Sequence, residues 1–66
     1  MHRDVIRNAK GVVCGYIDTD DKGNKTARDR TGKVLGYYKV VAKATTDSRG
    51  KPIAYSDIVS SLIDVK

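Results

Sequence analysis

Side chains that commonly act as nucleophiles or metal ligands are scarce in this sequence. Cys14 is the only cysteine and His2 the only histidine among 66 residues. A cysteine becomes a strong nucleophile when a neighbouring base or cation favours its thiolate, and no histidine or acid is placed along the chain to activate Cys14. A tetrahedral zinc site built on one Cys and one His would need two carboxylates as well. We therefore expect no catalytic residue, no metal site and no bound cofactor.

The acidic stretch DTDDKGNK, residues 18–25, contains oxygen ligands of the kind that bind calcium. Asp18, Asp20, Asp21 and Asn24 have some of the spacing of a calcium-binding loop. An EF-hand loop ends in a bidentate glutamate at its twelfth position, and all eight acidic residues of this chain are aspartate. We expect a solvated turn here, with calcium binding as the alternative.

Four tyrosines are the only aromatic residues. Tyrosines on a strand flanked by Lys and Arg can stack nucleobases, but a chain without Phe or Trp also needs its tyrosines in the core. Tyr16, Tyr37 and Tyr55 are equivalent in the repeat described below. We expect these three in the core, with partner contact as the alternative. Tyr38 has the opposite alternation and is expected to point to the other, exposed face.

Basic residues concentrate in the middle of the chain. Arg30 and Lys33 flank one expected turn, and Arg49 and Lys51 flank another, so their charges would project together if the turns are neighbours. Such a ridge attracts phosphates or an acidic protein surface, although lysines on strand edges also simply prevent aggregation. Interspersed acids, Asp29 and Asp47, weaken the case for nucleic acid. The expected partner-binding residues are Tyr38, Arg28, Arg30, Lys33, Arg49 and Lys51.

A repeat is the element that must position these side chains. Gly11, Gly32 and Gly50 each follow an Asn or Asp by three residues and precede a Tyr by five. Asx-x-x-Gly is typical of a tight turn, because the Asx side chain bonds the local backbone and glycine accepts a positive φ. The residues that follow alternate as in a strand. The sequence predicts three consecutive β-hairpins, at about residues 5–17, 26–38 and 44–56.

One position in each hairpin lacks a large side chain. It holds Gly15, Gly36 or Ala54, and a small residue within a strand usually marks the close approach of another backbone. A lone hairpin is unstable in water, and repeats gain stability by covering each other's apolar faces. We therefore expect an all-β fold with the hairpins around a pseudo-symmetry axis. Apolar residues at 58, 59, 62 and 63 have helical spacing and predict a short C-terminal helix over residues 57–63.

Size and charge set the broad class. The 66 residues predict a single domain, and 13 basic against 8 acidic residues give a net charge of +5. A core of this size rarely supplies more than about 3–5 kcal/mol, and one cysteine cannot form an intrachain disulfide, so we expect a homo-oligomer. The sequence has no apolar run long enough for a membrane span and no signal peptide. With a free cysteine, these features predict a cytoplasmic protein.

The motifs resemble those of small bacterial and phage β-hairpin-repeat proteins, the "β-flower" proteins, in which hairpins radiate around a pseudo-symmetry axis. The resemblance covers about residues 5–63 and is carried by D-x-x-G-x-V-L-G-Y-Y (29–38), T-x-D-x-x-G-x-x-I-A (45–54) and S-S-L-I (60–63). It implies a phage-encoded protein that acts in the cytoplasm of a bacterial host, and it implies no catalytic residue. Pro52 departs from the Val of the other two repeats, and its missing N–H predicts that the third hairpin lies at an edge.

The expected function is that of a non-enzymatic interaction module. It would bind a bacterial host protein or complex, for example as an inhibitor of a defence system. Two alternatives remain from the sequence. The chain could bind nucleic acid through its basic ridge, with an affinity that falls steeply with salt, or it could be a small self-assembling structural protein.

Overall fold

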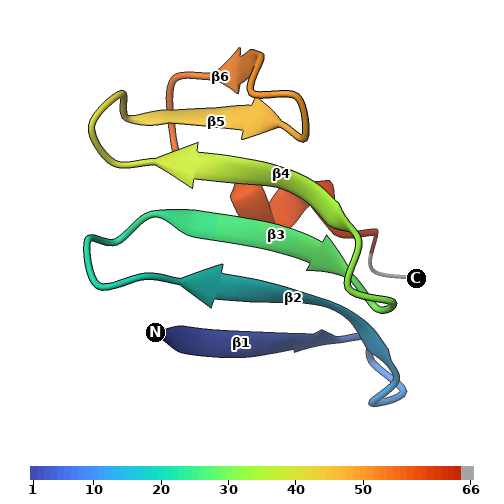
Figure 1. The fold of residues 1–66 in the computed structure, drawn as a ribbon. Helices are drawn as coiled ribbons and strands as arrows, with labels where there is room; N and C mark the ends of the chain where they lie inside the picture. The colour runs from blue at the N-terminus through green and yellow to red at the C-terminus, as the bar shows by residue number, and fades with distance from the viewer. Residues whose placement is uncertain (65–66) are drawn as a thin grey trace.

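The computed structural model describes residues 1–64, which form one open antiparallel sheet with a short 3-10 helix against it (Figure 1). The six strands are neighbours in the sheet in the same order as in the chain. Their bounds are β1 His2–Arg7, β2 Val13–Thr19, β3 Lys25–Asp29, β4 Val34–Lys39, β5 Ala44–Asp47 and β6 Pro52–Ala54, and the 3-10 helix η1 spans Val59–Leu62. The all-β prediction is confirmed. Pro52 begins the edge strand β6, as its missing N–H predicts.

Four of the five strand connections share one turn structure. In the β3–β4 turn, the Gly32 amide donates to the Asp29 carbonyl at 3.0 Å, and Asp29 Oδ1 accepts from the amides of Thr31 and Lys33, each at 2.9 Å. The turns that begin at Asn8, Asp20 and Asp47 repeat these bonds. Their glycines have φ between 81° and 94°, a region that other residues rarely adopt. The glycine turns predicted at residues 11, 32 and 50 are therefore confirmed, and the turn at Asp20–Gly23 is a fourth of the same kind.

A β-bulge follows three of these turns and changes which side chains face the core. The pairing passes from Ile6–Gly15 to Arg7–Val13, from Ala27–Gly36 to Arg28–Val34, and from Thr45–Ala54 to Thr46–Pro52. The residues left without a partner are Cys14, Leu35 and Ile53. An inserted residue shifts the alternation of the strand by one. The expectation that Tyr16, Tyr37 and Tyr55 face a common interior is therefore wrong. Ile17 and Tyr38, the residues that follow the first two, contribute to the core instead, and Tyr55 is exposed.

The core lies between the sheet and the C-terminal segment. Ile17 and Ala27 from the sheet pack with Val59 and Ile63, and all four side chains are at least 92% buried. Figure 1 shows η1 lying across one face of the sheet, behind β3 and β4. We call this the covered face, and we call the opposite side of the sheet the open face.

Small residues at 15 and 36 give the C-terminal segment its room. A Cβ atom on Gly36 would collide with the Thr46 carbonyl oxygen and lie 2.5 Å from Leu62 Cδ1. A Cβ atom on Gly15 would collide with the Arg28 carbonyl oxygen and lie 2.9 Å from Ile63 Cγ2. The close approach expected from these small residues thus involves both a neighbouring strand and the covering segment.

The predicted helix over residues 57–63 is a 3-10 helix of only four residues. The polar groups that could start a longer helix are engaged with the sheet. Buried Thr45 donates its hydroxyl to the Ser56 carbonyl at 2.6 Å and accepts from the Ile58 amide at 3.0 Å, and the Asp57 carboxylate bonds Lys25 Nζ at 2.6 Å. A helix this short does not recover the cost of its own nucleation. The tight turn nevertheless brings Val59 and Ile63 onto the sheet.

Candidate binding surfaces

The first surface is formed by the turns after β1, β3 and β5, which lie at the same end of the meander (Figure 1). We call it the turn end. It presents five exposed basic residues that form no ion pair within residues 1–64: Lys10, Arg30, Lys33, Arg49 and Lys51. Arg30, Lys33, Arg49 and Lys51 are predicted partner-binding residues, and the fold brings them to one end of the molecule as the repeat implied.

Acids at the turn end serve the backbone. The Thr31 hydroxyl and the amides of Lys33 and Thr31 hold the pKa of Asp29 below its ordinary value, against the raising effect of desolvation. The amides of Lys51 and Arg49 lower the pKa of Asp47 in the same way. Both carboxylates therefore stay ionised at neutral pH, and each fixes the backbone of cationic residues beside it.

Arg28 and Tyr38, the other predicted contact residues, lie on opposite faces. Arg28 is half-buried on the open face, where its guanidinium reaches Asp18 and the Gly32 carbonyl oxygen. Tyr38 packs against the core cluster on the covered face, with Lys25 Nζ 6.0 Å from the centre of its ring. The expectation that Tyr38 points away from the core is wrong, because the bulge at Leu35 reverses the alternation of β4.

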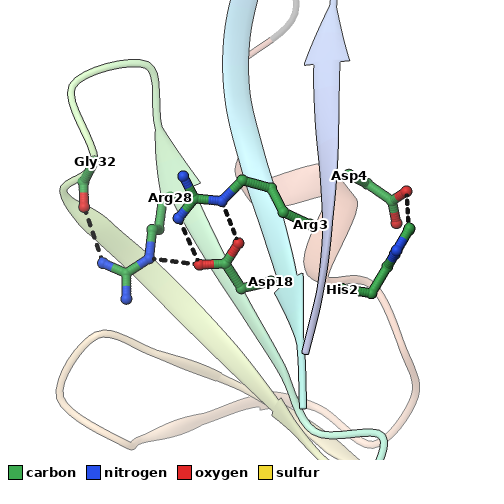
Figure 2. A network of polar contacts seen from close by, with 6 residues as sticks. All are labelled: His2, Arg3, Asp4, Asp18, Arg28 and Gly32. Atoms are coloured by element: carbon green, nitrogen blue, oxygen red, sulfur yellow. Dashed lines mark hydrogen bonds and ion pairs between the residues drawn. The ribbon is translucent and has the colours of Figure 1, made fainter. Parts of the chain in front are cut away.

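An ion-pair network occupies the open face (Figure 2). Arg3 donates from Nε to Asp18 Oδ1 at 2.6 Å and from Nη2 to Oδ2 at 2.9 Å, and Arg28 Nε donates to Oδ2 at 3.1 Å. The Asp18 side chain is only 12% exposed. Its hydrogen bonds to Arg3, and then to Arg28, lower the pKa of Asp18 although burial alone would raise it. Figure 2 also shows His2 bonded to Asp4, at 2.9 Å, beside the network.

Two tyrosines lie on the open face, each with a cation above its ring. The Arg3 guanidinium carbon is 4.9 Å from the centre of the Tyr16 ring, and Lys39 Nζ is 4.8 Å from the centre of the Tyr37 ring. Both rings are half-buried. Tyr55, after β6, is 81% exposed. The core cluster therefore contains none of these three tyrosines, and contact with a partner, the alternative, stays a prediction.

Cys14 borders a groove of about 620 Å³ between the first and third turns. Its thiol makes a weak hydrogen bond, 3.6 Å long, to the Val12 carbonyl oxygen, and its side chain packs against the core. The groove is lined by Asn8, Val12, Val13, Cys14, Asp29, Arg30, Thr31 and Asp64.

The acidic stretch at residues 18–25 forms the β2–β3 turn. Asp20 accepts from the amides of Lys22 and Asn24 and from the Asn24 side chain, while Asp18 is committed to two arginines. The carboxylate oxygens of Asp18 and Asp20 are thus hydrogen-bonded to the protein, whereas the Asp21 side chain is 96% exposed. Within residues 1–64, no three His, Cys, Asp or Glu side chains are grouped as metal ligands.

Sequence reasoning missed the grouping of five residues on the open face: Arg3, Tyr16, Asp18, Tyr37 and Lys39. Their grouping depends on the strand register, which pairs Arg3 with Asp18 and Tyr16 with Arg28. The signal present in the sequence was the stretch GYID, in which Ile17 is a better core residue than Tyr16. With Ile17 assigned to the core, the alternation of the strand would have predicted Tyr16 and Asp18 on the opposite face.

Comparison of the chain with models of protein families, with curated proteins and with solved structures finds no match. No helix within residues 1–64 has the length and apolar character needed to cross a membrane.

Proposed function

We propose that this chain is a non-enzymatic interaction module that binds an acidic surface of a partner protein through its turn end. The observation that carries the proposal is the gathering of exposed cations on three turns at the same end of the sheet. The β3–β4 turn contains Arg30 and Lys33, and the β5–β6 turn contains Arg49 and Lys51. A surface on which cations outnumber acids raises the association rate with an acidic partner and selects against basic partners.

The backbone of this surface is held in place before binding. The amides of Arg49 and Lys51 both donate to Asp47, and the amide of Lys33 donates to Asp29. A surface whose backbone is already ordered loses less entropy when it binds. The carboxylates between the cations favour a protein over nucleic acid as the partner, since a protein surface offers both signs of charge and a phosphate backbone only one.

The partner we propose is a protein or complex of a bacterial host, for example a defence system that a phage-encoded inhibitor would block in the cytoplasm. This part of the proposal is supported by the resemblance to β-flower proteins and is analogy. We also propose that the three hairpins are copies of one unit around a pseudo-symmetry axis. Support comes from the shared turn bonds and from the bulge at Cys14, Leu35 and Ile53 in each.

Self-association is part of the same proposal. Within residues 1–64, the central cluster consists of four buried side chains, and β1 and β6 are edge strands with one side unpaired in the sheet. A small core and free edges both favour burial of further surface between copies. Light scattering would then give a mass above the 7.2 kDa of one chain, and a mass of 7.2 kDa would exclude this part.

Charge reversal at the turn end tests the main proposal. The variant Arg30→Glu/Arg49→Glu is compared with Lys22→Glu/Lys43→Glu, which changes the net charge equally at the opposite end of the sheet. Tagged chains are incubated with nuclease-treated bacterial lysate. A defined protein should be retained by the wild type and by the control, and should be lost, by tenfold or more, with the turn-end variant. Equal capture by both variants, or no retained protein, contradicts the proposal.

A further inference from the structure

Charges are sorted between the two faces of the sheet. Three strand cations, Arg3, Arg28 and Lys39, lie on the open face, where they contact Asp18, Tyr16 or Tyr37. Most carboxylates lie elsewhere. Asp4, Asp29 and Asp47 are in register with the covered-face residues Ile17, Gly15 and Gly36, Asp57 and Asp64 belong to the covering segment, and Asp20 and Asp21 are in the β2–β3 turn.

Asp18 is the one carboxylate that the register places on the open face within the described strands. Two guanidiniums bond it, and its side chain is 12% exposed. An approaching polyanion therefore meets the outer edges of Arg3 and Arg28 and the unpaired ammonium of Lys39. The face offers net positive charge with its acid shielded, which is the electrostatic requirement for binding phosphates.

Phosphate attraction alone would not need aromatic rings, and this face has two. Tyr16 and Tyr37 stand on alternate strands, β2 and β4, about 10 Å apart across the sheet by the usual strand spacing. Arg28 and Thr26 of β3 lie between them, each paired with one of the two tyrosines. Tyr37 also borders a shallow groove of about 210 Å³, whose lining includes Thr26, Arg28 and Lys39 together with the carboxylates of Asp18 and Asp20.

The cation above the Tyr37 ring marks a position that a base would occupy. A cation over an exposed aromatic ring contributes about 0.5–1 kcal/mol, whereas a stacked base contributes about 1–3 kcal/mol. A base would therefore displace Lys39 from the Tyr37 ring, and Lys39 would then be free to bond the adjacent phosphate. Arg3 stays on Asp18, to which it donates two hydrogen bonds, and offers only its outer edge. An acidic peptide could pair with the cations but would gain nothing from the rings, and a duplex hides its base faces.

We propose that the open face of the sheet binds single-stranded nucleic acid, with a base stacked on Tyr37 and phosphates held by Lys39, Arg28 and the outer edge of Arg3. This surface is separate from the turn end, so either proposal can fail without the other.

Fluorescence anisotropy with a labelled oligothymidylate of about 12 nucleotides, within the usual site sizes of single-strand-binding folds, tests the proposal. Tyr37→Leu removes the ring but keeps apolar volume, and should weaken binding roughly 5- to 150-fold with little change in salt dependence. The matched control is Tyr55→Leu, at an exposed tyrosine over which no cation of residues 1–64 lies. This variant should leave the affinity unchanged.

Salt dependence provides a second readout that leaves the rings intact. Lys39→Gln should weaken binding and reduce the slope of log K against log salt by about 0.7, the value for one phosphate contact on a single strand. Lys22→Gln, in the β2–β3 turn, should keep the wild-type slope. Absence of binding at low salt overturns the proposal, as does equal binding by wild type and Tyr37→Leu. Tighter binding of polyglutamate or of a duplex of the same length assigns the face to another partner and also overturns it.

Discussion

At the scale of single residues, Asn8, Asp20, Asp29 and Asp47 have one structural role. Each accepts two backbone amides and closes a turn whose glycine has a positive φ. The first turn does this with a neutral amide and the other three with a carboxylate. Ionisation is therefore not needed for the turn to form, but where the group is a carboxylate, its ionised form accepts the bonds better.

Stability should consequently fall in acid, and this fall should depend on the turn aspartates. The pKa of Asp29 and of Asp47 is lowered on folding, so their contribution is fully present above the ordinary carboxyl pKa of about 3.9 and is lost as pH falls through the lower folded value. We predict that Asp29→Asn/Asp47→Asn folds at neutral pH, as Asn8 does in its own turn, and loses less stability between about pH 5 and pH 2 than the wild type.

Urea unfolding at several pH values, followed by circular dichroism, measures this difference. Asp21→Asn is the control, because the Asp21 side chain is 96% exposed and takes no part in the turn bonds. It should leave the loss of stability in acid as it is in the wild type. If the free energy of unfolding falls as steeply in acid for the double variant as for the wild type, these turns do not cause the pH dependence of stability.

Residue identity predicts the turns but not the faces of the strands. An Asx-x-x-Gly turn is local, because four consecutive residues supply both the side-chain acceptor and the glycine that adopts a positive φ. A bulge is visible only in the pairing of two strands. The extra residue at Leu35 exchanges the positions of Tyr37 and Tyr38, so the candidate surface predicted from strict alternation contained Tyr38 in place of Tyr37.

At the scale of elements, the C-terminal segment supplies half of the central cluster. Val59 and Ile63 are 2% and 4% exposed and pack on Ile17 and Ala27. The helical spacing of residues 58, 59, 62 and 63 correctly indicated an apolar surface that turns toward the sheet. It did not distinguish a 3-10 turn from an α-helix, because two pairs of apolar residues satisfy both over so short a span.

Truncation of one side chain in this segment should remove most of the stability of the domain. Ile63→Ala should cost about 2–5 kcal/mol as a buried large-to-small substitution, which is comparable with the whole net stability expected of a core this small. Ile53→Ala, at a residue that is 50% exposed on β6, should cost less than about 1 kcal/mol. Urea denaturation of both variants makes the comparison, and equal losses would contradict the role given to the segment.

At the scale of the whole molecule, the chain is a thin sheet, one face of which is covered by the C-terminal segment. The principal dimensions are 35 × 23 × 18 Å. The sequence repeat predicted hairpins and an all-β class. The open meander follows from the connections at residues 20–23 and 40–43, because they also reverse the chain and so join all the strands in one sheet. Both proposed surfaces depend on this arrangement. The meander brings the turns after β1, β3 and β5 to one end, and the C-terminal segment covers only one face, which leaves Tyr16 and Tyr37 uncovered on the other.

Nuclear Overhauser contacts between tyrosine rings and the methyl groups of the C-terminal segment test this two-faced arrangement most directly. Adjacent residues Tyr37 and Tyr38 are the informative pair, because the structure assigns them to opposite faces. The Tyr38 ring should show contacts to methyl groups of the cluster formed by Ile17, Ala27, Val59 and Ile63, while the rings of Tyr16 and Tyr37 show none to Val59 or Ile63. Contacts from Tyr37 to Val59 or Ile63, with none from Tyr38 to the cluster, would reverse the faces and contradict the account.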